Sequence, residues 1–472
     1  MAVAYRESLG TRGFRLNPWI ANEFFSAVLV TVAAFAVVAG AELARRKGGF
    51  APELARKILH VGSGILVCFF PWLFKSATSV FILAAVFFLF LFLARIFRCL
   101  SCLSDVERRS VGELLFPISV GVLFWLSRDK PAYYLASLLP MIVPDAAAAL
   151  VGKKYGYYLF EMEDGGKKSL EGSAAFFALS CLATFLPLAL MTDLPRNVLA
   201  LAVLHLAFLI VCLEGICVGG FDNLVVPLLS FYALIQTTRS DVSWISAQIG
   251  IEFFALAITL LLAWRGRLLG VSGFLTAQLY LYSTYAFGNF YCLTPPIVVY
   301  AVVALFRRPA TFRIRPGGYK SVAFFWAISV PFAILWVRNF LIIFLKAGPW
   351  MYWAPVLPFY FAAAHGAGLA CLGQIYRPKW ERRLPRGLAW ALWPTLGAVA
   401  ALVFAESVRG PRDSLTGVTA VLVGAVGWVT PILQKAANWT REKTEAAGAH
   451  RLALSLALAT GLALGCQWLL RD

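Results

Sequence analysis

Residues 76 to 94, SATSVFILAAVFFLFLFLA, form a continuous apolar segment without a single charged side chain. A run of this length can cross the hydrocarbon core of a bilayer as an α-helix. Similar runs recur from Ile20 to Leu470, and 60% of the 472 residues are hydrophobic while only 14% are charged. The runs are continuous rather than alternating, which excludes a membrane barrel. The sequence therefore predicts an all-α, polytopic membrane protein with roughly 14 to 16 transmembrane helices.

Positive charges are distributed unevenly among the loops between these segments. If the segments cross the membrane in strict alternation, one side holds 29 of the 42 lysines and arginines, whereas the other side with the N-terminal tail holds 12. The positive-inside rule makes the richer side cytoplasmic. The net charge of +18 is then a topology signal, and nucleic acid is not expected as a partner. We expect a multi-pass protein of the cell membrane, or of an ER-type membrane in a eukaryote, with its active site on the cytoplasmic side.

Acidic residues are concentrated in the first half of the chain. Residues 53 to 222 hold 13 of the 24 acidic residues, whereas residues 238 to 413 hold five. Chemistry that needs carboxylates therefore belongs to the first half. We predict a catalytic membrane domain over residues 1–237 and an accessory membrane domain of unknown role over residues 238–472.

Four polar stretches interrupt the apolar segments of the first half, and all four fall on the predicted cytoplasmic face. They are ELARKILH (53–60), ERRSVGELLFP (107–117), DAAAALVGKKYGYYLFEMEDGGKKSLEGS (145–173) and EGICVGGFDNLVVP (214–227). An ionised residue near the end of a span, such as Asp145, is costly unless a partner satisfies it. Magnesium bound to phosphates is one suitable partner.

The stretch after Asp145 has the composition of a phosphate-binding loop. Glycines expose backbone N–H groups and lysines supply point charges for an anionic phosphate chain. The spacing is not that of a Walker A loop, because Met162 and Lys167 stand where its two glycines are required. Lysines in a loop also serve as ordinary topology determinants, and a lone aspartate can cap a helix. The candidates for nucleotide binding are Gly152, Gly156, Gly166, Lys167, Lys168, Ser169 and Gly172.

These motifs resemble the CTP-dependent polyprenol kinase family, which includes dolichol, phytol and farnesol kinases and a CTP-dependent diacylglycerol kinase. The resemblance covers roughly residues 20 to 237 and is carried by DAAAALVGKKYG and GKKSLEGS, with support from ARKILH, GELLFP and FDNLVVP. It implies phosphoryl transfer from CTP, or a related nucleoside triphosphate, to the hydroxyl of an isoprenoid alcohol dissolved in the membrane.

The resemblance also implies roles for individual residues. Asp145 matches the essential acidic position of the family, and the segment from Lys167 to Gly172 matches its nucleotide loop. Asp145 or Glu171 is expected to accept the proton of the alcohol. The position of the other polar stretches on the same face adds further expected site residues: Asp222 as a catalytic group, Asp145, Glu113 and Asp222 as ligands of Mg²⁺, and Lys57 and His60 as phosphate-binding groups. For His60, a role as the base and a role in packing alone stay open.

Two positions depart from the family pattern. Phe221 precedes Asp222 where relatives often have a second acid, and Pro144 precedes Asp145 where a glycine is common. Either difference bears on metal geometry or on the choice of nucleotide.

Three other functions remain open from the sequence. A CTP-dependent diacylglycerol kinase would differ in the acceptor alone. A cytidylyltransferase would form a CDP-lipid and release pyrophosphate. In a lipid transporter, the polar stretches would line the path of the lipid headgroup through the protein, and no nucleotide would be turned over.

Overall fold

The structure is a computed structural model, and it describes residues 22–287 except 98, 101–109, 162–166, 218 and 267–270, together with Leu293 and Ile297. The chain divides into two compact units, Met1–Ile249 and Gly250–Asp472. The four polar stretches all belong to the first unit. The domain boundary between residues 237 and 238 stays a prediction, and the apolar segments predicted beyond residue 290 lie outside the described helices.

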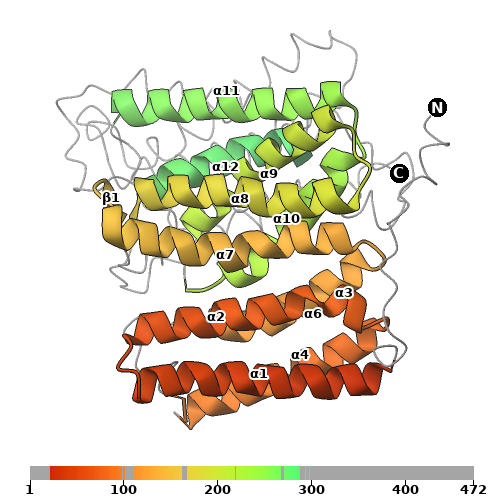
Figure 1. Cartoon of the computed structure of the whole chain (residues 1–472). Helices are drawn as coiled ribbons and strands as arrows, with labels where there is room; N and C mark the ends of the chain where they lie inside the picture. Colours follow the sequence, from red (N-terminus) through yellow and green to blue (C-terminus); the bar gives the residue numbers. More distant parts are fainter. Residues whose placement is uncertain are drawn as a thin grey trace, which may run out of the picture. The chain divides into compact units, whose positions relative to one another are not determined.

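The described part of the chain is almost entirely helical, and Figure 1 shows its long helices. Six of these are long and apolar enough to cross a membrane: α1, α4, α7, α8, α9 and residues 242–261 of α11. The predicted all-α polytopic class is therefore confirmed. The helices are α1 (Glu23–Arg46), α2 (Pro52–Cys68), α3 (Phe70–Leu73), α4 (Ala77–Ile96), α6 (Gly112–Ser127), α7 (Pro131–Tyr155), α8 (Leu170–Met191), α9 (Arg196–Ile216), α10 (Asp222–Thr238), α11 (Val242–Gly266) and α12 (Val271–Phe287).

The core of the first unit is centred on α7. Tyr134 is fully buried, and its hydroxyl donates a hydrogen bond of 3.0 Å to the carbonyl oxygen of Val67 in α2. The neighbouring Tyr133 donates a hydrogen bond of 3.0 Å to the Thr238 hydroxyl in α10. A buried tyrosine hydroxyl usually forms a hydrogen bond, because burying it without a partner is costly. These bonds fix α7 between α2 and α10.

Small residues bring α7 and α8 into close contact, and the two helices lie side by side in Figure 1. A Cβ atom on Gly152 would lie 2.9 Å from the Ser169 hydroxyl oxygen, and one on Gly172 would lie 3.0 Å from the carbonyl oxygen of Ala148. Glycines allow this approach in membrane helix pairs. Gly152 and Gly172, two of the predicted nucleotide-binding glycines, therefore also allow α7 and α8 to pack closely.

Gly156→Ala is expected to destabilise the protein by about 1–3 kcal/mol, because overpacking at a close contact forces backbone shifts. The added Cβ would lie 2.8 Å from Cβ of Ser169. Gly40→Ala is the matched control, since its Cβ would meet no atom within 4 Å. The control gains up to about 1 kcal/mol from helix propensity. Thermal unfolding in detergent measures both, and equal midpoints would contradict the packing described here.

Two stretches between the apolar segments contain regular structure. Residues 42–57 are mostly helical, because α1 continues to Arg46 and α2 begins at Pro52. Proline suits the first turn of a helix, and an Arg56–Glu53 ion pair of 2.6 Å supports the polar turn. The polar stretch over residues 145–173 contains an antiparallel hairpin of β1 (Leu159–Glu161) and β2 (Lys167–Ser169).

Candidate functional site

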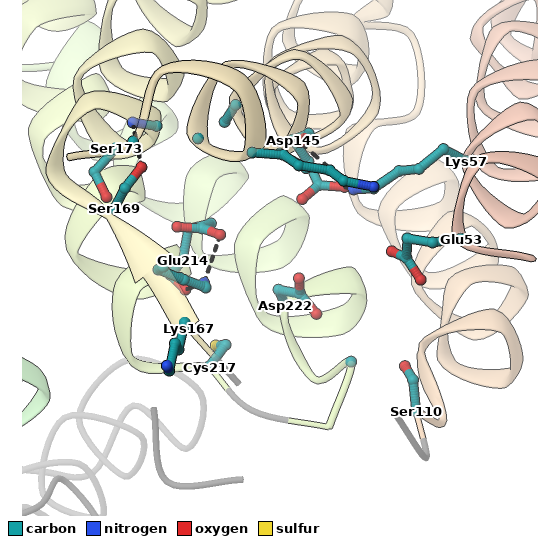
Figure 2. Close-up of a pocket in the computed structure, with 18 of the residues that line it drawn as sticks. Glu53, Lys57, Ser110, Asp145, Lys167, Ser169, Ser173, Glu214, Cys217 and Asp222 are labelled. Atoms are coloured by element: carbon teal, nitrogen blue, oxygen red, sulfur yellow. Dashed lines mark hydrogen bonds and ion pairs between the residues drawn. The ribbon is translucent and has the colours of Figure 1, made fainter. Parts of the chain in front are cut away.

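All four polar stretches contribute to one pocket with a volume of about 490 Å³. Its walls come from α2, α7, α8, α9 and α10 and from the residues around β2. Figure 2 shows the carboxylates of Asp145, Glu214, Asp222 and Glu53 arranged around the same space. The cationic side chains that line it are Arg56, Lys57, Lys153, Lys167 and Lys168. This charge pattern suits an anionic ligand together with a cation.

Asp145 forms an ion pair with a lysine 88 residues earlier in the chain. Nζ of Lys57 lies 2.6 Å from Oδ2 of Asp145, a contact drawn as a dashed line in Figure 2. His60 lies one turn further along α2, with Nε2 3.9 Å from the same oxygen. That nitrogen is also 3.0 Å from the carbonyl oxygen of Met141. A carbonyl oxygen only accepts, so Nε2 donates this hydrogen bond.

A second ion pair links β2 to α9. Nζ of Lys168 lies 2.5 Å from both Oε1 and the carbonyl oxygen of Glu214. The two side chains are only 20% and 12% exposed. Glu214 was not among the predicted site residues, although it opens the fourth polar stretch. An acidic residue at the polar end of a span was the signal that could have identified it.

Ser169 and Glu171 shape the beginning of α8. The Ser169 hydroxyl accepts a hydrogen bond of 3.0 Å from the backbone N–H of Gly172 and is the N-cap of the helix. Oε1 of Glu171 accepts a hydrogen bond of 3.1 Å from the backbone N–H of Tyr158. Ser169 and Gly172 line the pocket, whereas Glu171 does not. Glu171 therefore holds the hairpin against the helix, and the positive end of the α8 dipole faces the pocket.

Two lysines of the pocket make no ion pair with any residue in the described ranges. Lys167 was predicted, whereas Lys153 was missed although it directly follows Gly152 in the quoted stretch. Both are exposed. They are the cations of this pocket that are free to meet an incoming anion.

Asp222 is placed by a tight turn before α10. Gly219 and Gly220 have φ values of +65° and +89°, which favour glycine. The carbonyl oxygen of Gly219 accepts a hydrogen bond of 2.8 Å from the N–H of Val111. A Cβ on Gly220 would lie 2.6 Å from Cα of Gly112, so the turn packs directly against the start of α6. The turn thus brings Asp222 to the pocket, where its carboxylate makes no ion pair with a described residue.

Three further residues complete the comparison with the predicted site. Glu113 does not line this pocket but lines a smaller one beside it, and it forms an ion pair of 2.9 Å with Arg95, which joins α4 to α6. Gly166 lies outside the described residues. Cys217 lines the pocket, and burial raises the pKa of its thiol to about 12. The thiol is therefore protonated at neutral pH and supplies neither a thiolate nucleophile nor a thiolate ligand.

The fold and the pocket define a class of protein: a polytopic helical membrane protein with a highly charged pocket built from the polar ends of its helices. The phytol kinase of Synechocystis sp. is 33% identical to this chain over 196 residues, which are 41% of this chain and 83% of that protein. The chain therefore belongs to the phytol and polyprenol kinase family, a family of membrane kinases, and the resemblance drawn from its motifs is confirmed. No protein-family model matches the chain. No solved structure matches it either.

Proposed function

We propose that this chain transfers the γ-phosphoryl group of CTP to the hydroxyl of an isoprenoid alcohol such as phytol, dolichol or another polyprenol. The observation that carries the proposal is the pocket itself, in which four polar stretches, separate in sequence, bring lysines and carboxylates together beside apolar helices. The similarity to phytol kinase supports a prenyl-type acceptor, and the motif resemblance supports CTP as the donor.

The triphosphate is assigned to the side of the pocket formed by α8 and β2. Lys167 and Lys153 are free to pair with phosphate oxygens, and the N-terminus of α8 adds a positive dipole end. Lys168 is held in place by Glu214 and presents a fixed charge at the same wall. Phosphoryl transfer depends mainly on positioning and on neutralising charge, and these groups supply both.

Magnesium is the expected cofactor, and the donor set fits it. In the described ranges no group of three or more His, Cys, Asp or Glu residues could hold a metal by itself. Magnesium is commonly bound by one or two carboxylates together with substrate phosphates. Asp145 and Asp222, which line the same pocket, would hold it. Bound magnesium would neutralise charge on the phosphates, and Glu113 is not required for this role.

Asp145 is the proposed acceptor of the alcohol proton. Of the two carboxylates considered for this task, it lines the pocket and Glu171 does not. Lys57 and His60 surround its carboxylate and keep it oriented. In this proposal, Glu171 is a positioning residue that acts through the hairpin.

A substrate panel tests the proposed function. Purified protein in detergent is incubated with CTP, UTP or ATP and with phytol, farnesol, undecaprenol, dolichol or diacylglycerol. We expect a phosphorylated isoprenoid alcohol with CTP as the preferred donor. Phosphorylation of diacylglycerol alone would make the chain a diacylglycerol kinase, and turnover of none of the alcohols would overturn the proposal.

Lys167→Gln is expected to raise the KM for nucleotide roughly tenfold, because it removes one charge-assisted hydrogen bond to phosphate. The KM for the alcohol is expected to stay within about twofold. Lys154→Gln is the control, since Lys154 lies over the Tyr155 ring at 5.0 Å and does not line the pocket. Equal changes of both Michaelis constants in Lys167→Gln would contradict the assignment.

A further inference from the structure

A second, smaller pocket adjoins the charged one. It has a volume of about 110 Å³ and lies among α1, α2, α4 and α6. Most of its walls are apolar, and they include Val30, Ala34, Leu59, Leu83, Phe87 and Phe116. We refer to it as the apolar pocket.

The apolar pocket exists because these four helices form two tightly packed pairs. A Cβ on Gly62 would lie 2.7 Å from a methyl group of Val37, so α1 and α2 approach closely. A Cβ on Gly121 would lie 3.1 Å from the ring of Phe81, so α4 and α6 also approach closely. Between the pairs, α1 contacts α4 at few positions. The space left between the two pairs is the apolar pocket.

The ends of this space are tied together. At one end, Oε1 of Glu23 accepts hydrogen bonds of 2.9 and 2.7 Å from the backbone N–H groups of Lys75 and Ser76, which links the starts of α1 and α4. At the other end, an Arg46 nitrogen donates a hydrogen bond of 3.2 Å to the carbonyl oxygen of Cys99. The apolar pocket therefore lies between helices whose ends are held together by hydrogen bonds, and it does not result from unravelled helix ends.

The apolar and charged pockets share part of their walls. Arg56, His60 and Asn223 line both. The His60 ring lies 5.7 Å from the Phe116 ring, which belongs to the apolar pocket, and its Nε2 lies 3.9 Å from Asp145, which belongs to the charged pocket. His60 therefore marks the junction between an apolar site and a site suited to phosphates.

We infer that the apolar pocket binds the hydroxyl-bearing end of the lipid acceptor, with the hydroxyl at the His60 junction and the first part of the hydrocarbon chain between α1 and α4. This inference rests on the proposed function and adds the binding site of the acceptor to it. A ligand with one polar end and an apolar chain matches a site that combines a few polar residues, Arg56, His60, Ser63, Glu113 and Asn223, with otherwise apolar walls. The hydroxyl then lies beside Asp145, the proposed proton acceptor.

The size of the apolar pocket limits what it holds. Its 110 Å³ is small beside the roughly 300–1,000 Å³ of pockets that enclose a whole drug-sized ligand. Only the end of a long chain fits, and the remainder lies outside. Exposed apolar side chains of α1 and α4, such as Val32 and Val86, offer a surface of the kind that contacts lipid. The pocket thus selects for an apolar chain next to the hydroxyl and not for total chain length.

Ala34→Phe tests the inference, with Ala36→Phe as the matched control. Ala34 is buried and lines the apolar pocket, whereas Ala36, two residues along the same helix, is exposed. Filling the pocket is expected to raise the KM for the alcohol by about tenfold or more. The KM for CTP is expected to stay within about twofold of wild type in both variants.

The results of these kinetic measurements distinguish a failure of this inference from a failure of the proposed function. If the wild-type protein phosphorylates no alcohol, the proposed function fails. If the wild-type protein is active and Ala34→Phe has the same KM for alcohol as Ala36→Phe, the inference is overturned.

Photo-crosslinking of the wild-type protein supplies a second test that does not depend on the folding of a variant. A farnesol analogue with a diazirine near its hydroxyl is expected to label peptides from α1, α2, α4 or α6. Labelling confined to other helices would contradict the inference, even in an active protein.

Discussion

Asp145→Asn is expected to lower kcat for phosphoryl transfer by about 100-fold or more while leaving the amount of protein in the membrane unchanged. The substitution removes the charge that would hold magnesium and accept the proton, and general base catalysis and charge stabilisation each contribute factors of about this size. The asparagine oxygen can still accept the hydrogen bond that Lys57 now donates at 2.6 Å. Because this hydrogen bond is kept, we expect the loss to be mainly catalytic, with a smaller loss of stability from the charge of Lys57, which is left unpaired at a position only 14% exposed.

Asp129→Asn is the control for Asp145→Asn. Asp129 is exposed in the turn between α6 and α7, away from the pocket. We expect this variant to retain wild-type turnover. Steady-state rates in detergent, together with the protein content of the membrane fraction, decide the comparison. Turnover of Asp145→Asn within about twofold of wild type would remove Asp145 from the proposed mechanism.

Lys168→Met is expected both to inactivate the protein and to destabilise it by about 3 kcal/mol, because it leaves the carboxylate of Glu214 unpaired at a largely buried position. The two charged groups are in contact at 2.5 Å, and each side chain is at most 20% exposed. Adding Glu214→Leu in the same chain is expected to restore much of the stability, since replacing both partners removes the unpaired charge. The double variant is expected to remain inactive.

Arg46→Met provides the control for the Lys168 variants. Arg46 pairs with Glu42 on α1 and donates a hydrogen bond to the carbonyl oxygen of Cys99, but its side chain is 61% exposed. Exposed ion pairs contribute at most about 1 kcal/mol, so the midpoint of thermal unfolding should fall less than in Lys168→Met. A Lys168→Met protein as stable as Arg46→Met would show that the Lys168–Glu214 pair is not a structural support of the pocket.

The sequence predicted the helices well where hydrophobic length alone decides the structure. The apolar segment at residues 76 to 94 corresponds to α4, Ala77–Ile96. The four polar stretches were placed on one face by counting spans, and they do line one pocket. The side of the membrane that this pocket faces stays a prediction.

Contacts between residues far apart in the sequence could not be predicted from the pattern of apolar and polar residues. The Lys57–Asp145 pair joins residues 88 positions apart, and its formation depends on the packing of α2 against α7. The apolar pocket also follows from helix pairing, since its walls have the same composition as any other membrane helix. The hairpin of β1 and β2 was missed because a polar loop flanked by long apolar runs gives no alternating pattern of useful length.

The central claim is that the chain transfers the γ-phosphoryl group of CTP to an isoprenoid alcohol, and tracing the two ends of the nucleotide tests it most directly. Purified protein is incubated with phytol, farnesol or dolichol and with CTP labelled with ³²P at either the γ or the α position. We expect the γ label to enter the lipid and the α label to remain in CDP. Appearance of the α label in the lipid, with release of pyrophosphate, would identify a cytidylyltransferase. Transfer of neither label into the lipid would contradict a kinase.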